Sequence, residues 1–106
     1  ELGAGLGLPS IVVARLGVQA IATDGNPAAL RLLKQNTKRN APEGLLSQLR
    51  VEALLWGAEN PLALLGLERV PDLLLMADLV YASAREELTE KLQATLLALS
   101  DVHTLV

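Results

Sequence analysis

Hydrophobic and polar positions change their spacing repeatedly along the chain, between the period of a strand and that of a helix. Short apolar runs bounded by polar residues predict buried strands, and apolar residues three or four positions apart predict helices. Strands are expected at 18–23, 49–55, 73–77 and 103–106. Helices are expected at about 9–16, at 27–40, in a short turn after Asn60-Pro61, and from Ser83 onward. The chain therefore alternates strands with helices.

Local signals mark several helix ends. Asn26 can cap the second helix and Pro27 suits its first position, while Gly17 is a good left-handed end for the first helix. Ser83 and Glu86 have the spacing of a capping box. The last helix should bury one face, formed by Leu88, Leu92, Leu96 and Leu99.

The alternation predicts the α/β class, with a parallel sheet and helices on its faces. Right-handed crossovers would place the turns that follow the strands along one edge. The glycine-rich turn that opens the chain should follow a central strand, of which Glu1-Leu2 is the part present, and the chain stops inside its last predicted strand. We therefore expect residues 1–106 to be one partial domain, with the first and last strands of the sheet outside it.

Composition narrows the class of protein. Hydrophobic residues make up 51% of the 106 residues and charged residues 20%, which is typical of a globular domain. The net charge is −3, and the basic stretch 34–39 is read as a solvated helix face, so we expect no nucleic-acid partner. No apolar run approaches the ~20 residues of a membrane span. With one His and no Cys, we expect no metal site.

The stretch "ELGAGLGLPS" carries the first candidate chemistry. Gly3, Gly5 and Gly7 alternate behind Glu1, and such a turn lets the backbone approach a ligand closely at a helix N-terminus. The dinucleotide fingerprint G-x-G-x-x-G would need a glycine at Leu8. A nearby acid would repel a pyrophosphate but suits an ammonium or sulfonium group. The alternative is a tight strand–helix turn with a solvent-facing Glu1.

Asp24 ends the second predicted strand, 17 residues after Gly7. A carboxylate at this place can accept hydrogen bonds from both hydroxyls of a ribose. Asp24 alone does not separate a dinucleotide from another nucleoside ligand. The glycine spacing and Glu1 favour the cationic ligand.

These residues resemble class I S-adenosylmethionine-dependent methyltransferases. "ELGAGLGLPSI", "ATDGNPAAL", "LLWG" and "ADLVY" resemble, in order and spacing, the seven-β-strand lysine methyltransferase group, in particular the methyltransferase-like 21 type. "TDGN" is also similar to calmodulin-lysine methyltransferases, so the subfamily stays open. The resemblance covers residues 1–81. It implies a Rossmann-like three-layer α/β/α core and S-adenosylmethionine as cofactor.

The resemblance assigns cofactor-binding roles residue by residue. It implies that the backbone of Gly3-Ala4-Gly5 faces the methionyl part and that Glu1 binds the methionyl amino group. Asp24 would hold the ribose hydroxyls.

Two further cofactor contacts are implied near later strand ends. Trp56 would lie against the adenine, because a flat π-surface can be covered by an indole ring; otherwise it is an ordinary core aromatic. Ala77 would form a small wall beside the methionine moiety.

Asp78 and Tyr81 are the candidate catalytic residues, as the "DxxY" element of this family. Leu79 and Val80 stand where adenine and glutamine methyltransferases carry two prolines, which argues against those substrates. Asp78 would orient the incoming amine and Tyr81 would line the acceptor entrance. In the alternative interpretation both residues only shape the loop. His103 is expected to be structural or at the surface.

The expected function is S-adenosylmethionine-dependent methylation of a lysine side chain in a protein. The alternatives are a small-molecule methyltransferase of the same fold and a catalytically silent domain that binds partners; a nicotinamide-binding domain is disfavoured by Leu8. We expect no membrane partner and a location in the cytoplasm, with the nucleus as a second location. The sequence leaves the oligomeric state open, and a monomer is compatible with it.

Overall fold

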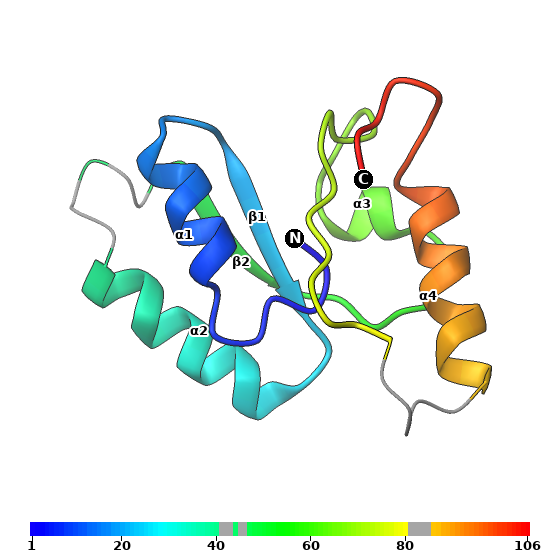
Figure 1. Cartoon of the computed structure of the whole chain (residues 1–106), viewed down its shortest axis with the longest axis horizontal. Helices are drawn as coiled ribbons and strands as arrows, with labels where there is room; N and C mark the ends of the chain where they lie inside the picture. Colours follow the sequence, from blue (N-terminus) through cyan, green and yellow to red (C-terminus); the bar gives the residue numbers. More distant parts are fainter. Residues whose placement is uncertain (41–43, 45–46, 81–85) are drawn as a thin grey trace. The chain divides into compact units, whose positions relative to one another are not determined.

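The computed structural model describes residues 1–40, 44, 47–80 and 86–106 (Figure 1). The chain divides into two compact units. The first unit comprises Glu1–Ala53 with Leu75–Ala77, and the second comprises Leu54–Leu74 with Asp78–Val106. Each unit is described by itself below.

The first unit is built on a parallel strand pair. Strands β1 (Ala20–Asp24) and β2 (Leu49–Ala53) align in register from Ala20 opposite Leu49 to Asp24 opposite Ala53. The predicted parallel pairing is confirmed. β1 begins two residues later than expected, and β2 ends at Ala53 instead of continuing to residue 55.

The opening residues extend this sheet on the free side of β1. Thr23 N donates to Glu1 O at 2.9 Å and Ala4 N donates to Thr23 O at 2.8 Å. On its other side, Leu2 bridges Met76 in parallel, with Leu2 N donating to Leu75 O at 3.0 Å. Glu1-Leu2 therefore lies in a central place, between β1 and the segment 75–77, as the sequence predicts.

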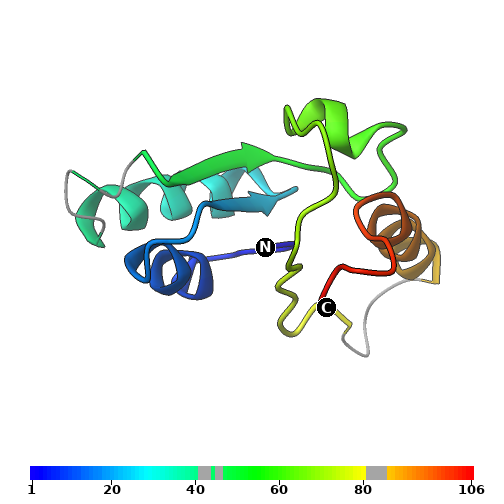
Figure 2. The same cartoon turned by 90° about the horizontal axis from the view of Figure 1, so that it is seen from above.

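Helices α1 (Leu8–Arg15) and α2 (Pro27–Asn40) pack on one face of the β1–β2 pair (Figures 1 and 2). The local signals explain their ends. Asn26 Oδ1 accepts a hydrogen bond from Ala28 N at 2.8 Å, so Asn26 caps α2 as predicted. Gly17 follows α1 with φ +86°, a conformation that strongly favours glycine.

The core of the first unit lies between the helices and this sheet face. Ala22 and Leu33 are completely buried, and they pack in one cluster with Ile11, Ala14 and Leu49. The small side chain of Ala22 lets the helices approach the strand closely. Burying a leucine such as Leu33 contributes about 1.5–3 kcal/mol of stability.

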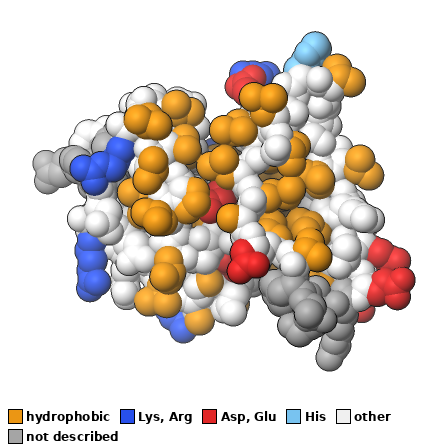
Figure 3. Space-filling model, viewed as in Figure 1, with side chains coloured by type: hydrophobic (Ala, Val, Ile, Leu, Met, Phe, Trp, Pro, Cys, Tyr) orange, Lys and Arg blue, Asp and Glu red, His pale blue; other side chains and the backbone are white. Residues whose placement is uncertain are grey.

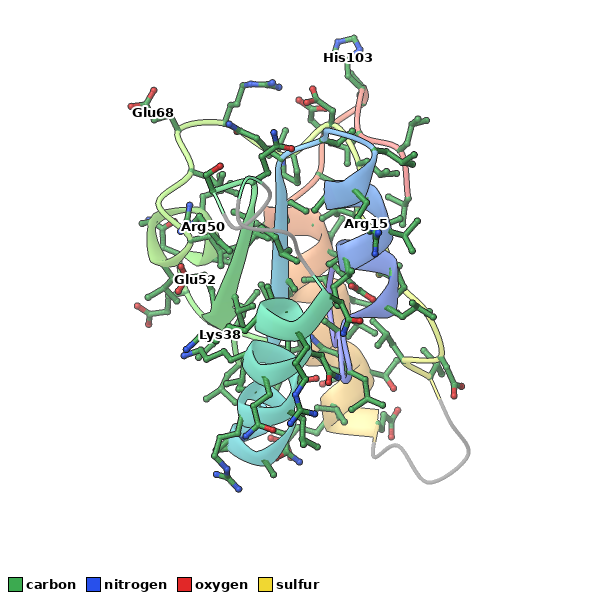
Figure 4. All side chains as sticks on the ribbon, turned by 90° about the vertical axis from the view of Figure 1, so that its left-hand side faces the viewer. Arg15, Lys38, Arg50, Glu52, Glu68 and His103 are labelled. Atoms are coloured by element: carbon green, nitrogen blue, oxygen red, sulfur yellow. The ribbon has the colours of Figure 1, made fainter. Side chains whose placement is uncertain are left out.

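The outer faces of the two helices differ in character. Leu8 and Val12 of α1 and its C-cap residue Leu16 recur every fourth residue and are 70%, 48% and 76% exposed. Figure 3 shows hydrophobic side chains gathered over this helix. On α2 the basic residues Lys34, Lys38 and Arg39 are exposed, and the Lys38 side chain points outward (Figure 4). The basic stretch is therefore a solvated face, as expected.

The second unit contains α3 (Pro61–Leu64) and α4 (Glu86–Ala98). Asn60 caps α3, because its Oδ1 accepts from Ala63 N at 3.1 Å. The predicted inner face of α4 is confirmed: Leu92 and Leu99 are buried, and Leu88 and Leu96 partly so. The proposed start at Ser83 lies outside the described residues. No helix in the described ranges is long and apolar enough to cross a membrane.

The prediction of a regular strand at 73–77 is wrong. Leu73 bridges Leu105, whereas Met76 bridges Leu2. The segment therefore changes its pairing partner part-way, and neither pairing continues over consecutive residues. For the same reason the strand expected at 103–106 is reduced to the single bridge at Leu105.

Candidate functional site

The glycine turn lies where the central segment of the first unit ends. Gly3, Gly5 and Gly7 have φ angles of +61°, +53° and +83°, so all three adopt a conformation that side-chain-bearing residues rarely take. Gly7 N donates to Ala4 O at 2.8 Å and closes the turn. The glycines are therefore required by the backbone path.

Gly5 and Gly7 differ in what surrounds them. A Cβ atom added to Gly7 would overlap Cδ1 of Leu33, so this glycine allows close packing of the turn on α2. A Cβ added to Gly5 would meet no described atom within 4 Å. Gly5 therefore borders open space, which is what a backbone that approaches a ligand needs.

Asp24 joins the end of β1 to the glycine turn. Its Oδ2 accepts from Gly5 N at 2.9 Å, and its Oδ1 accepts from Asn26 N at 2.8 Å. A carboxylate oxygen can accept more than one hydrogen bond. Asp24 thus holds the turn and still keeps acceptor capacity for the hydroxyls of a ribose.

Glu1 is held by the first turn of α1. Its Oε2 accepts from Ser10 Oγ at 2.6 Å and from Ser10 N at 3.1 Å. Oε1 accepts no hydrogen bond from the part of the chain that the structure describes. Oε2 is therefore bound to α1, whereas Oε1 is available to a ligand. The alternative of a solvent-facing Glu1 does not describe this side chain, which is partly buried and bonded to α1.

Ala77 lies at the same edge as the turn. The parallel bridge between Leu2 and Met76 places the next residues, Gly3 and Ala77, side by side beyond it. Ala77 is exposed, so it borders open space and not the core. The structure thus brings Glu1, Gly3, Ala4, Gly5, Asp24 and Ala77 together at one end of the first unit's sheet.

Trp56 belongs to the second unit, where it begins a turn with Gly57. Gly57 has φ +85°, and its N donates to Thr95 Oγ1 of α4 at 2.8 Å. A Cβ at Gly57 would lie 2.8 Å from Lys91 Cγ, so only glycine fits against α4. Helix α4 therefore fixes the backbone beside Trp56, whose contact with adenine stays a prediction.

The candidate catalytic residues are also in the second unit or outside the described residues. Asp78 is exposed and has φ +55°, a conformation that Asp tolerates better than most residues. Tyr81 lies outside the described residues, so its role stays a prediction. His103 is exposed in a turn and projects into solvent, as expected (Figure 4).

The parallel sheet, the positive-φ glycine turn and the two carboxylates all lie within a segment that matches a known family. A family model described as "Lysine methyltransferase" matches residues 1–106. The chain belongs to the lysine methyltransferase family.

Curated members of the lysine methyltransferase family resemble the chain closely. It is 42% identical over 110 residues to the protein N-lysine methyltransferase METTL21A of Danio rerio, and 37% identical over 108 residues to METTL21A of Xenopus tropicalis. Each alignment covers 100% of this chain and 45% of the relative. The protein N-terminal and lysine N-methyltransferase EFM7 of Candida glabrata is 36% identical over 85 residues, which cover 76% of this chain and 33% of that protein. The chain thus spans less than half the length of these relatives.

Two contacts of the site in this member of the lysine methyltransferase family were not expected from the sequence. Ser10 bonds Glu1, and Asn36 Nδ2 on α2 donates to Leu6 O at 3.0 Å. Ser10 lies nine residues from Glu1 and Asn36 lies 30 residues from Leu6, so no local spacing rule links either pair. For the first contact the sequence offers one signal: Ser10 is a small polar residue in the first turn of a helix, and an acid, Glu1, precedes that helix.

Proposed function

We propose that the chain forms the cofactor-binding part of an S-adenosylmethionine-dependent protein-lysine N-methyltransferase. The observation that carries the proposal is the glycine turn at the strand ends, with open space at Gly5 and the carboxylates of Glu1 and Asp24 beside it. The family match implies the same methyl donor.

The residues present fit this cofactor. S-adenosylmethionine carries an ammonium and a sulfonium group, and two carboxylates near the turn favour cationic groups electrostatically. The Gly5 position, which a side chain would fill, leaves room for a bound molecule. Asp24 keeps acceptor capacity for the ribose hydroxyls. The turn at residues 3–7 carries no Lys or Arg side chain that would bind a phosphate.

The roles of the chain's own residues follow from their chemistry. Glu1 would accept from the amino group through Oε1, Asp24 would hold the ribose, and Gly3-Ala4-Gly5 would present backbone to the methionyl part. Ala77 would leave space beside it, and Trp56 would cover the adenine. When bound, S-adenosylmethionine supplies a methyl group on a positively charged sulfur.

The acceptor would be a lysine side chain of a protein, because the relatives' names specify protein N-lysine methylation. A lysine amine with a pKa of ~10.4 must lose its proton before it can act as a nucleophile. Desolvation in the site favours the neutral amine, and the proton leaves to solvent water. Asp78 would orient the amine by accepting a hydrogen bond from it, and Tyr81 would line the acceptor entrance.

Calorimetry on the full-length protein tests the cofactor class. We expect S-adenosylhomocysteine to bind and NAD to give no heat, because the turn lacks the dinucleotide glycine spacing and carries an acid. Binding of NAD without S-adenosylhomocysteine would overturn the proposal in favour of a nicotinamide domain. Binding of neither would favour a silent, partner-binding domain.

A further inference from the structure

Ser10 is an almost completely buried polar residue with a specific partner. It is 1% exposed and lies in the first turn of α1. Its hydroxyl donates to Glu1 Oε2 at 2.6 Å, and its backbone N–H donates to the same oxygen at 3.1 Å. Both donors of one residue therefore end on one oxygen of the Glu1 carboxylate.

This geometry constrains the Glu1 side chain. A glutamate has three rotatable side-chain bonds, so a single hydrogen bond would leave its second oxygen free to change direction. Two bonds from neighbouring atoms of Ser10 hold Oε2 in place and so restrict the side-chain torsions of Glu1. Oε1 is restricted with them, and it accepts no hydrogen bond from the described residues.

We propose that Ser10 is a positioning residue that aims Glu1 Oε1 at the amino group of the cofactor's methionyl end. The inference rests on the proposed function, since it names the ligand group that Oε1 receives. Ser10 itself does not touch the cofactor. It acts by removing the conformational freedom that Glu1 would otherwise lose when the ligand binds.

Thr23 provides a matched control in the same unit. Its buried hydroxyl also bonds Glu1, but it donates to the backbone carbonyl at 2.8 Å and not to the carboxylate. Thr23→Val removes that hydroxyl at nearly constant volume. Ser10→Ala and Thr23→Val therefore both remove a buried hydrogen bond to Glu1, but only Ser10→Ala removes one from its carboxylate, which then keeps the backbone N–H bond alone.

The experiment compares two ligands on the full-length protein by calorimetry. S-adenosylhomocysteine carries the amino-acid end, whereas 5′-methylthioadenosine keeps the adenine and ribose but lacks that end. We expect Ser10→Ala to weaken S-adenosylhomocysteine binding by roughly tenfold, the scale of one charge-assisted hydrogen bond. Ser10→Ala should leave the affinity for 5′-methylthioadenosine unchanged. Thr23→Val should not change the ratio of the two ligand affinities.

Glu1→Gln gives a second, independent readout. It should cause the same selective loss for S-adenosylhomocysteine, and adding Ser10→Ala to it should cause little further loss, because both changes act through one carboxylate. If a thermal melt shows that Ser10→Ala does not fold, Glu1→Gln alone still tests whether the carboxylate selects the amino-acid end, and equal loss for both ligands would overturn the inference.

Three results would count against the inference. If Ser10→Ala weakened the binding of both ligands equally, Ser10 would have only a structural role. If it left the affinity for S-adenosylhomocysteine unchanged, Ser10 would not position Glu1 for binding. Additive effects of Ser10→Ala and Glu1→Gln would show that they act separately. If the unaltered protein bound neither ligand, the proposed function itself would fail, which is a different outcome from a loss of selectivity.

Discussion

Gly5 and Gly7 show how two identical residues in one turn can serve different purposes. Both have a positive φ, but Gly7 packs against the buried Leu33 and Gly5 borders open space. The alternate glycine spacing thus combines a packing requirement with a ligand requirement. Only the second bears on function.

Alanine substitutions should separate the two requirements. Gly7→Ala should lower the free energy of unfolding by about 3 kcal/mol, because backbone strain adds to overlap with Leu33, which has no room to move. Gly5→Ala should cost only about 1–2 kcal/mol, from backbone strain alone. Denaturant unfolding of the two variants measures the difference.

The same pair makes an opposite prediction for ligand binding. Gly5→Ala places a methyl group in the open space and should weaken S-adenosylhomocysteine binding more than Gly7→Ala does. If Gly5→Ala and Gly7→Ala lost the same free energy of unfolding and bound S-adenosylhomocysteine with the same affinity, the two glycines would not have different roles.

For individual residues, the candidates could be identified from the sequence, but their hydrogen bonds could not. Glu1 and Asp24 could be singled out because an acid before a glycine turn and an acid after a strand are chemical signals. Their contacts with Ser10 and Gly5 N depend on side-chain rotamers and on how the turn folds back. Those features arise only when the segments meet in space.

Helix α2 illustrates which elements could be predicted to the residue. It runs over Pro27–Asn40 as expected, because Asn26 and Pro27 are local signals that act before any tertiary contact forms. The segment 73–77 could not be predicted as well, since a strand exists only through its partners. Here the partners change from Leu105 to Leu2 within four residues.

Adjacent leucines on α2 test how the helix is attached to the sheet. Leu33 is completely buried and Leu32 is 47% exposed. Leu33→Ala should reduce the free energy of unfolding by about 2–5 kcal/mol, because it opens a cavity in the core. Leu32→Ala, the matched control, should change it by at most about 0.5 kcal/mol.

Both variants keep α2 rich in helix-forming residues, so intrinsic propensity does not explain a difference between them. Chemical unfolding followed by circular dichroism gives the two free energies. Similar values for both variants would mean that Leu33 does not join α2 to the strands.

For the whole molecule, the α/β class could be predicted because strand and helix periods alternate, and the parallel pairing of β1 with β2 confirms it. The family could be recognised because four short motifs occur in one order. The places of Trp56 and Tyr81 relative to the glycine turn stay predictions. Long-range placement depends on contacts between segments, which spacing along the chain does not encode.

The central claim is methylation of a protein lysine, and transfer of a labelled methyl group tests it most directly. The full-length protein is incubated with S-adenosylmethionine labelled in its methyl group and with cell extract, and the modified residue is located by mass spectrometry. Asp24→Ala, which should weaken cofactor binding by about 1–3 kcal/mol, serves as the matched variant. We predict label on lysine side chains of protein, and less of it for Asp24→Ala at low cofactor concentration. Label only in small molecules, or none at all, would contradict the account.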